Sequence, residues 1–225
     1  GTDLNIKEGT VSLAESFINT SKGINSITLP STLRILGKES LKNAAFTSID
    51  LPESLEKIGE GAFAAGDGGS SNLRRITIPK NVKIIESGAF YGTPLVRVYY
   101  NAVDANNEYV EHTDGTSAYE RIFPESVTRI IIGEGVKSIP NSLFDGCKNI
   151  TRVEMPSTVE SIGDYAFNGC TSLSHIDLHL YGCDFAYGKA LMAVRDDFAI
   201  SGMLIRPDRC VVVNGCEGPE KSAPF

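Results

Sequence analysis

A short apolar strand that ends in proline recurs along this chain about every 23 residues, and a large apolar residue follows each proline eleven positions later. The pairs are Pro30 with Leu41, Pro52 with Phe63, Pro79 with Phe90, Pro156 with Phe167, and Gly133, in the proline position, with Phe144. A unit of this length cannot bury its own apolar face and must stack on copies of itself. The repeat therefore predicts a solenoid, an architecture that provides binding surfaces far more often than active sites.

Each repeat also carries apolar residues six, three and one positions before the proline, as Phe46, Ile49 and Leu51 lie before Pro52. The last two are two positions apart, which is the period of a β-strand with one buried face. Proline cannot donate a backbone hydrogen bond, so it suits the end of such a strand. No stretch shows the apolar stripe of a long helix.

The repeats predict one solenoid domain over residues 1–179, with about eight units, and a degenerate last repeat with a C-terminal cap over 180–225. A cap is expected because an open solenoid end exposes apolar side chains and a free sheet edge. Two longer intervals indicate insertions near 66–72 and over 101–122. The first is rich in glycine and serine, which is typical of a flexible loop. The second contains Asp114-Gly115, which favours a projecting hairpin or loop, and Phe123 then resumes the column of large apolar residues.

We expect the large apolar residue of each repeat to form the core. The residues concerned are Phe17 (one position out of phase), Leu41, Phe63, Phe90, Phe144 and Phe167. Cys147 and Cys170 share another repeat position and are expected to be buried neighbours. Parallel side chains in register hold their Cβ atoms farther apart than a disulfide prefers, so they are interpreted as small apolar residues. The pairing of Cys183, Cys210 and Cys216 stays open.

The most regular repeat runs from Val153 to Cys170, where proline, Ile-Gly, Ala-Phe and Gly-Cys occur together at fixed offsets. This pattern resembles the BspA-like leucine-rich repeats, which occur in surface proteins of gut and oral bacteria and of some protist parasites. The resemblance implies an α/β-type repeat fold. We expect a right-handed leucine-rich-repeat solenoid with a parallel β-sheet on one face, and loops, short strands or short helical turns on the other. It also implies a secreted or cell-surface location and adhesion to host or neighbouring-cell proteins, including matrix proteins.

Two columns of strand residues are expected to face solvent, four and two positions before the proline. The first column holds arginine in four consecutive repeats, as Arg75, Arg97, Arg129 and Arg152. Guanidinium groups about 4.8 Å apart could bind carboxylates, sulfates or phosphates in a bidentate manner. Alternatively, the arginines lie over apolar neighbours and pair with Glu154 or Asp177 of the second column.

The second column places Tyr99 and Ile131 beside Arg97 and Arg129. A mixture of aromatic, aliphatic and arginine side chains is typical of interface hot spots. The insertion of the same repeat adds two aromatic residues, Tyr109 and Tyr119. We therefore expect this region to contact a partner.

His175, Asp177 and His179 alternate along one strand and are expected to point to one face, with side chains that suit a divalent metal ion. Alternate strand residues lie about 7 Å apart, which is too far for three ligands of one ion, so a solvated strand is the favoured interpretation. The sequence contains no glycine-rich phosphate loop, and His112 has no serine or cysteine partner at a recognisable spacing. We therefore expect neither catalysis nor a cofactor.

The formal net charge of −7 argues against general affinity for nucleic acids or anionic membranes. No apolar run approaches the length of a membrane helix. The chain opens with Gly1-Thr2-Asp3 rather than with a signal peptide, which says little about export if the start has been trimmed.

Three functions remain open from the sequence. The first is an extracellular binding module for a protein, which uses the outer sheet face and the 101–122 insertion. The second is a receptor for anionic glycans that uses the row of arginines, and the third is a structural spacer without a ligand. Glycan binding should weaken steeply with salt, whereas a protein interface centred on aromatic residues should weaken much less.

Overall fold

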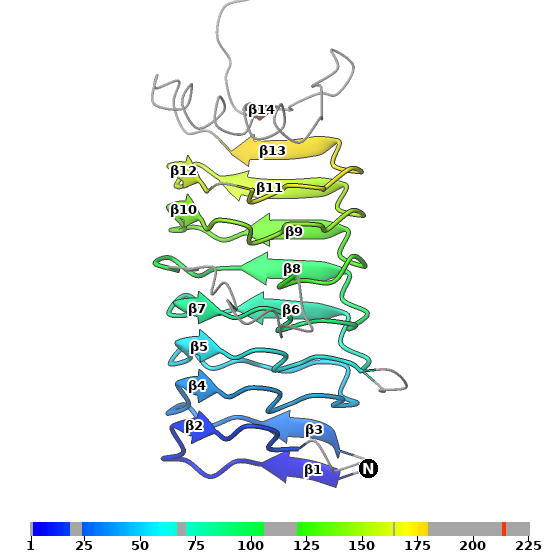
Figure 1. Ribbon diagram of the computed structural model, residues 1–225. Coiled ribbons are helices and arrows are strands. Elements are labelled where there is room, and N and C mark those ends of the chain that lie inside the picture. Colours follow the sequence, from blue (N-terminus) through cyan, green and yellow to red (C-terminus); the bar gives the residue numbers. More distant parts are fainter. Residues whose placement is uncertain are drawn as a thin grey trace, which may run out of the picture.

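The chain winds into successive coils that stack along one axis, as the computed structural model shows from the side (Figure 1). The structure describes residues 2–18, 24–66, 71–105, 121–163, 165–179 and 213–214. Within these ranges it contains strands and turns but no helix. Most coils contribute one longer strand to one face and one two-residue strand to a second face, and the pairings are parallel. The predicted parallel β-solenoid is confirmed, with short strands and turns opposite the main sheet.

The longer strands form the first sheet, in two parts with the orders β1-β3 and β6-β8-β9-β11-β13-β14. Their bounds are β1 (Thr2–Asn5), β3 (Ile24–Thr28), β6 (Arg75–Ile78), β8 (Arg97–Tyr100), β9 (Arg129–Ile132), β11 (Arg152–Pro156), β13 (His175–His179) and β14 (Val213–Asn214). The two-residue strands form the second sheet, also in two parts, β2-β4-β5-β7 and β10-β12. Their bounds are β2 (Ser12–Leu13), β4 (Ile35–Leu36), β5 (Lys57–Ile58), β7 (Ile84–Ile85), β10 (Ser138–Ile139) and β12 (Ser161–Ile162).

The strand register pairs the same position of successive repeats. Ile76 lies opposite Val98, Val98 opposite Ile130, and Ile130 opposite Val153. The register continues across the insertion between β8 and β9, where Arg97 lies opposite Arg129 and Tyr100 opposite Ile132. Most of that insertion (106–120), the centre of the first one (67–70) and, apart from β14, the predicted cap at 180–225 lie outside the described residues.

The first sheet is interrupted in the third coil, where a strand was predicted before Pro52. Residues 46–51 form no strand, although Phe46 and Ile49 still point into the core. Ser48 and Asp50 occupy the outward positions of this segment and are exposed. The prediction of a strand here was wrong because core-facing side chains alone do not establish ladder hydrogen bonds.

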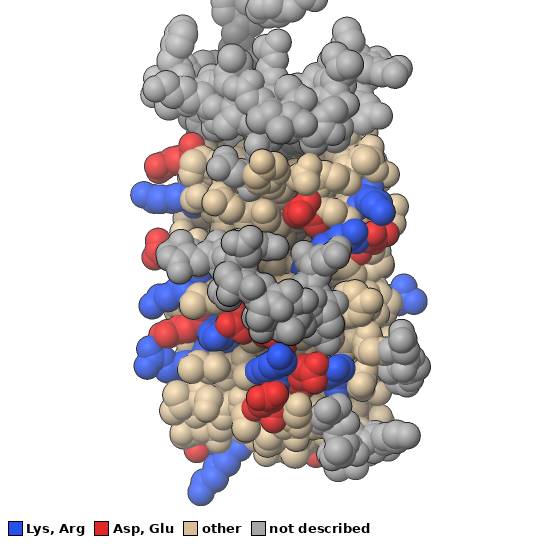
Figure 2. All heavy atoms as spheres, viewed as in Figure 1, with Lys and Arg blue, Asp and Glu red and all other residues tan. Residues whose placement is uncertain are grey.

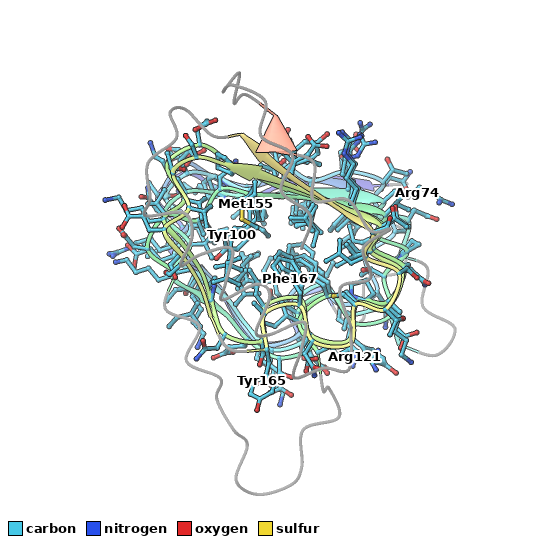
Figure 3. The ribbon with its side chains drawn as sticks, turned by 90° about the horizontal axis from the view of Figure 1, so that it is seen from above. Arg74, Tyr100, Arg121, Met155, Tyr165 and Phe167 are labelled. Atoms are coloured by element: carbon cyan, nitrogen blue, oxygen red, sulfur yellow. The ribbon has the colours of Figure 1, made fainter. Side chains whose placement is uncertain are left out.

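Stacked phenylalanine rings run through the centre of the solenoid, where Phe167 lies in the view down the axis (Figure 3). The ring centroids are 5.1 Å apart for Phe63 and Phe90, 5.0 Å for Phe90 and Phe123, 5.3 Å for Phe123 and Phe144, and 5.4 Å for Phe144 and Phe167. Leu41 continues the column and is fully buried. Phe123 occupies the position that the sequence assigned to it, despite the insertion before it.

The predicted core position of Phe17 is wrong. Its side chain is 43 % exposed, whereas that of Ile18 is 4 % exposed and lies in the core. Ile18 follows Lys7 by eleven residues, the same offset that separates Pro52 from Phe63. The phase of the repeat, rather than the size of the residue, therefore decides which side chain enters the core.

Cys147 and Cys170 are buried free thiols, as predicted. The Cys147 Sγ lies 3.7 Å from the Phe123 carbonyl oxygen and the Cys170 Sγ lies 3.3 Å from that of Phe144, so each thiol donates to the preceding coil. Burial raises the pKa of the Cys170 thiol to about 12. Both residues therefore act as small apolar side chains with a weak hydrogen bond. Cys183, Cys210 and Cys216 lie outside the described residues.

One strand residue, Tyr100, brings a polar atom into the core. Its ring lies edge-on to that of Phe144, at a centroid distance of 6.2 Å. Its hydroxyl is buried without a hydrogen-bond partner among the described residues, and burial raises the pKa of this group above its ordinary value. An unsatisfied buried hydroxyl is unfavourable, so the packing of the ring must offset its cost.

The third side of the solenoid, which we call the turn face, consists of the turns around residues 39–43, 61–65, 88–92, 142–146 and 165–169. The first residue of each turn has a positive φ: Glu39, Gly61, Gly88, Ser142 and Tyr165. Alternate N–H groups of a turn then point toward the following coil. Leu41 N donates to Ala62 O (2.8 Å), Phe63 N to Ala89 O (2.7 Å) and Ala65 N to Tyr91 O (2.7 Å). These hydrogen bonds replace the helical turns that were expected as one alternative.

Successive coils approach most closely at a glycine that follows the two-residue strands. A Cβ atom on Gly59 would lie 2.8 Å from the carbonyl carbon of Gly37, and one on Gly37 would lie 2.6 Å from the Leu13 oxygen. Both contacts involve backbone atoms, which cannot move aside as a side chain can. Glycine is therefore required here by close approach rather than by its backbone angles.

We predict that Gly59→Ala lowers the free energy of unfolding by about 1–3 kcal/mol, because the added methyl group overpacks a backbone contact. Gly66→Ala is the matched control, since its Cβ would meet no atom closer than 3.8 Å. Urea denaturation measures both changes. Equal effects of the two substitutions would contradict the role assigned to the close approach.

We also predict that Phe90→Ala costs about 3–5 kcal/mol of unfolding free energy, because it removes a ring stacked between two others. Phe17→Ala should change stability by less than about 1 kcal/mol, since that side chain is largely exposed. Thermal and urea denaturation followed by circular dichroism tests the pair. The reverse order would overturn the core assignment.

Candidate functional site

The outer face of the sheet β6-β8-β9-β11 carries the two columns that the repeat places in solvent. The arginine column consists of Arg75, Arg97, Arg129 and Arg152, which lie directly opposite one another in the strand register. The mixed column consists of Thr77, Tyr99, Ile131 and Glu154, in the same coils. The structure thus brings together the predicted site residues of these four strands.

Strand alternation directs these side chains outward. In β6, Arg75 and Thr77 are exposed while Ile76 and Ile78 are buried, and β8 and β9 repeat this pattern with partly exposed outer residues. The face is held on its inner side by the core and along its length by parallel pairing. Its side chains are therefore presented from a continuous, well-supported backbone.

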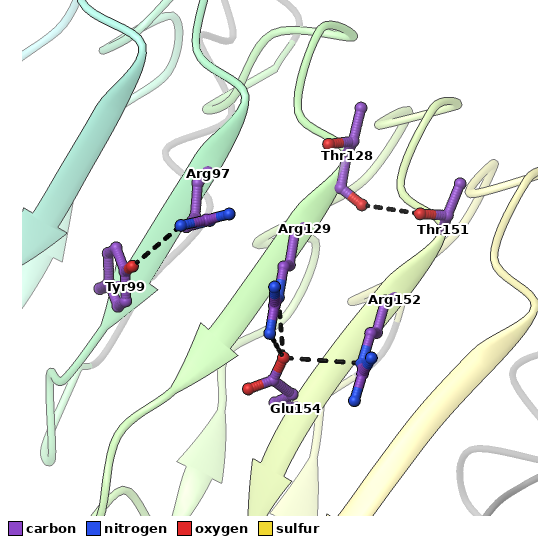
Figure 4. Close-up of polar contacts among 7 residues, drawn as sticks. All are labelled: Arg97, Tyr99, Thr128, Arg129, Thr151, Arg152 and Glu154. Carbon is purple, nitrogen blue, oxygen red and sulfur yellow. Dashed lines mark hydrogen bonds and ion pairs between the residues drawn. The ribbon is translucent and has the colours of Figure 1, made fainter.

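One carboxylate, that of Glu154, pairs with both arginines in the C-terminal half of the arginine column (Figure 4). Arg129 Nε donates to Glu154 Oε1 at 2.8 Å, and its Nη2 contacts the same oxygen. Arg152 Nε lies 3.6 Å from that oxygen. Glu154 therefore contacts two arginines. This is the lateral pairing that the sequence left open as an alternative to a free arginine row.

The N-terminal half of the column lacks such a partner. Arg97 Nη1 donates to the Tyr99 hydroxyl oxygen at 3.4 Å (Figure 4), and its Nε is enclosed without a hydrogen-bond acceptor. Arg75 is exposed. Neither Arg75 nor Arg97 forms an ion pair within the part of the chain that the structure describes. Among the described residues, the column therefore contains two guanidinium groups that pair with a carboxylate and two that do not.

A ladder of hydroxyl groups fixes the edge of the sheet next to the arginine column. Thr128 Oγ1 donates to the Val96 carbonyl at 3.3 Å, Thr151 Oγ1 to the Thr128 carbonyl at 3.2 Å, and Ser174 Oγ to the Thr151 carbonyl at 3.3 Å. Each of these bonds joins one coil to the next at the residue that precedes a strand. They help to hold the strands in register beneath the exposed columns.

The other predicted site residues are only partly located. Tyr109 and Tyr119 lie outside the described residues. His175, Asp177 and His179 lie in β13, in register with Arg152, Glu154 and Pro156, but their side chains are not described. Among the described residues, no group of three histidine, cysteine, aspartate or glutamate side chains is placed to hold a metal ion. No described helix is long and apolar enough to cross a membrane.

The sequence reasoning missed a shallow groove at the edge of the first four coils. Its lining residues lie two or four positions after the proline position: Val11, Thr32, Arg34, Ser54, Glu56, Asn81 and Lys83. The recurrence of polar residues two and four positions after the proline position could have indicated this groove. The Arg34–Glu56 ion pair (2.5 Å) joins successive coils beside it, as Lys57–Glu86 (2.5 Å) does nearby. On the side shown in Figure 2, positive and negative side chains likewise lie next to one another.

The sequence matches the family model described as BspA type leucine rich repeat region, in six copies over residues 2–110 and 116–183. The chain is also similar to two solved structures. One is a leucine-rich repeat protein from Bacteroides ovatus ATCC 8483, with 17 % identity and a TM-score of 0.36, which covers 79 % of this chain and 55 % of that one. The other is a leucine rich cell surface protein from Faecalibacterium prausnitzii A2-165, with 20 % identity and a TM-score of 0.32, which covers 84 % and 62 %. The chain thus spans less than two thirds of either structure. No curated protein matches it.

We predict that Glu154→Gln lowers the free energy of unfolding by no more than about 1 kcal/mol, because ion pairs at a solvated surface contribute little. Arg75→Gln should be neutral or slightly stabilising, since it removes a like charge opposite Arg97. Urea denaturation of both variants measures these changes. A loss above about 3 kcal/mol for Glu154→Gln would show instead that the carboxylate acts as a buried structural group.

Proposed function

Since the chain belongs to the BspA-type leucine-rich repeat family, we propose that it is a non-catalytic binding module that recognises a protein. The proposed contact surface is the outer face of the sheet β6-β8-β9-β11. One observation carries this proposal: the strand register places Arg97, Tyr99 and Ile131 next to one another on that face. Repeats of this family are typical of protein-interaction modules.

The chemistry of the surface supports a protein partner. Tyr99 supplies a large, partly exposed ring whose hydroxyl accepts a hydrogen bond from Arg97, and Ile131 supplies an apolar neighbour. Tyrosine and arginine are enriched among residues that contribute most to binding energy. Their side chains stand on a sheet that need not reorganise, so little conformational entropy is lost on association.

The proposed contact region includes the 101–122 insertion, because Tyr109 and Tyr119 belong to the same repeat as Tyr99. We place the protein outside the cell or on its surface, as BspA-like repeats are typical of bacterial surface proteins. The proposed partner is then a surface or matrix protein of a host or of a neighbouring cell, and the proposed role is adhesion.

Two alternatives compete with this proposal. A receptor for anionic glycans would use the arginine column, but a glycan that followed the whole column would meet the Glu154 carboxylate beside Arg129 and Arg152. A structural spacer would use neither column. The glycan alternative predicts that the side chains of Tyr99 and Ile131 are dispensable for binding, and the spacer alternative predicts no binding.

The test is an array of extracellular-matrix proteins and a parallel array of sulfated and uronic-acid glycans, at about 150 mM salt. We expect the wild type to bind a protein on the first array, and Tyr99→Ala/Ile131→Ser to weaken that binding at least about tenfold. Tyr91→Ala is the control, because Tyr91 is an exposed tyrosine on the turn face. Equal losses for both variants, binding to glycans alone, or no binding on either array would overturn the proposal.

A further inference from the structure

We propose that Arg75 and Arg97 form a carboxylate-binding site, and that the protein partner presents a short acidic segment to it. This inference rests on the proposed function and specifies the chemistry of the partner. It starts from the division of the arginine column into two arginines that pair with Glu154 and two that meet no carboxylate among the described residues.

The two guanidinium groups repel one another as the structure stands. Arg75 and Arg97 are directly opposed in the register of β6 and β8, on strands about 4.8 Å apart. Like charges in such cross-strand pairs are unfavourable. Glu154 relieves the same repulsion between Arg129 and Arg152, whereas no described carboxylate does so for Arg75 and Arg97. A carboxylate from a partner would therefore be more favourable here than anywhere else on the column.

The neighbours of Arg97 determine which of its guanidinium nitrogens can contact a ligand. Its Nε is enclosed, and its Nη1 lies 3.4 Å from the Tyr99 hydroxyl oxygen. The terminal nitrogens are therefore the ones that can meet an incoming carboxylate. Because Tyr99 already orients this side chain, little rotamer freedom is lost when the carboxylate binds.

The length of the site is limited by acidic residues of the mixed column. Thr77, Tyr99 and Ile131 are uncharged, whereas Glu154 follows Ile131 in the register and Asp50 holds the same repeat position in the coil before β6. The uncharged stretch covers three strands, a span on the order of 10 Å between the outer two. This span matches a few residues of an extended peptide, whose consecutive Cα atoms lie about 3.8 Å apart.

These limits favour an acidic protein segment over a long sulfated glycan. A polyanion would extend beyond the three strands and meet the carboxylates that flank them. The net charge of −7 would also repel a highly charged polymer at long range. A short segment with two or three carboxylates gains the contacts with Arg75 and Arg97 and ends before the flanking carboxylates. It also carries less charge for the net charge of the protein to repel.

The test uses three probes: a fluorescein-labelled triglutamate peptide, its triglutamine counterpart and a heparin hexasaccharide. Fluorescence anisotropy is recorded for the labelled peptides at low and high salt, and calorimetry is used for the saccharide. The variants are Arg75→Gln/Arg97→Gln and the control Arg34→Gln/Lys137→Gln, which changes the net charge equally on other faces.

We expect the wild type to bind triglutamate but not triglutamine, with affinity that falls as salt rises. The Arg75→Gln/Arg97→Gln variant should bind triglutamate at least about tenfold more weakly, and the control should differ from wild type by less than about threefold. Absence of triglutamate binding, equal losses in both variants, or binding of heparin alone would overturn the inference.

A partner protein identified on the array of matrix proteins allows this inference and the proposed function to be tested separately. If Tyr99→Ala/Ile131→Ser abolishes its binding and Arg75→Gln/Arg97→Gln does not, the protein-binding function stands and the carboxylate site is wrong. If both variants weaken the partner at least about tenfold, both proposals are supported. If neither does, both are wrong.

Discussion

Stacking of each coil in register on the next is the interaction on which this structure depends. A single repeat is too short to enclose apolar side chains, so the rings of the phenylalanine column are buried against the rings and apolar side chains of neighbouring coils. The same stacking satisfies the backbone through parallel ladders and through the hydroxyl groups of Thr128 and Thr151. It also sets the spacing that leaves room only for glycine at Gly59. Core, backbone and residue choice therefore follow from one geometric condition.

This register governs the surface as well, because it brings equivalent outward positions together. The chain relieves the resulting charge repulsion by placing opposite charges in successive coils, as in Arg34–Glu56, Lys57–Glu86 and Arg129–Glu154. Against this background the Arg75–Arg97 pair stands out, since repulsion there is retained within the described residues. Unfavourable local electrostatics that persist on a well-supported sheet are a reason to expect a ligand, because binding removes their cost.

The repeat phase predicted the features that stacking controls: the core column, the return of Phe123 after the insertion, and the two outward columns. The prediction that Phe17 lies in the core was wrong because the size of the aromatic residue was given more weight than the phase of the repeat. The phase places Ile18 in the core. The prediction of a strand before Pro52 was wrong because a β-ladder depends on backbone pairing. The apolar side chains of Phe46 and Ile49 indicate burial but not such pairing. The sequence could not establish that Glu154 pairs with both Arg129 and Arg152, since the side-chain rotamers decide which acidic neighbour each arginine contacts. The groove near Arg34 depends on how far the side chains of four coils project from the surface. The spacing of residues in the sequence does not give that projection.

The backbone hydrogen bonds that join successive coils on the turn face run in one sense, from the N–H of one coil to the carbonyl of the next, as from Leu41 to Ala62 and from Phe63 to Ala89. Peptide units such as the one between Ala62 and Phe63 accept from one side and donate to the other, so their dipoles align as they do in an α-helix. The solenoid is therefore an electrically polar rod along this face, negative toward its N-terminal pole and positive toward its C-terminal pole. A body that stacks on the first coil there must supply N–H groups to its outward carbonyls. An inverted copy would present carbonyls of its own at this pole, so addition there is head-to-tail.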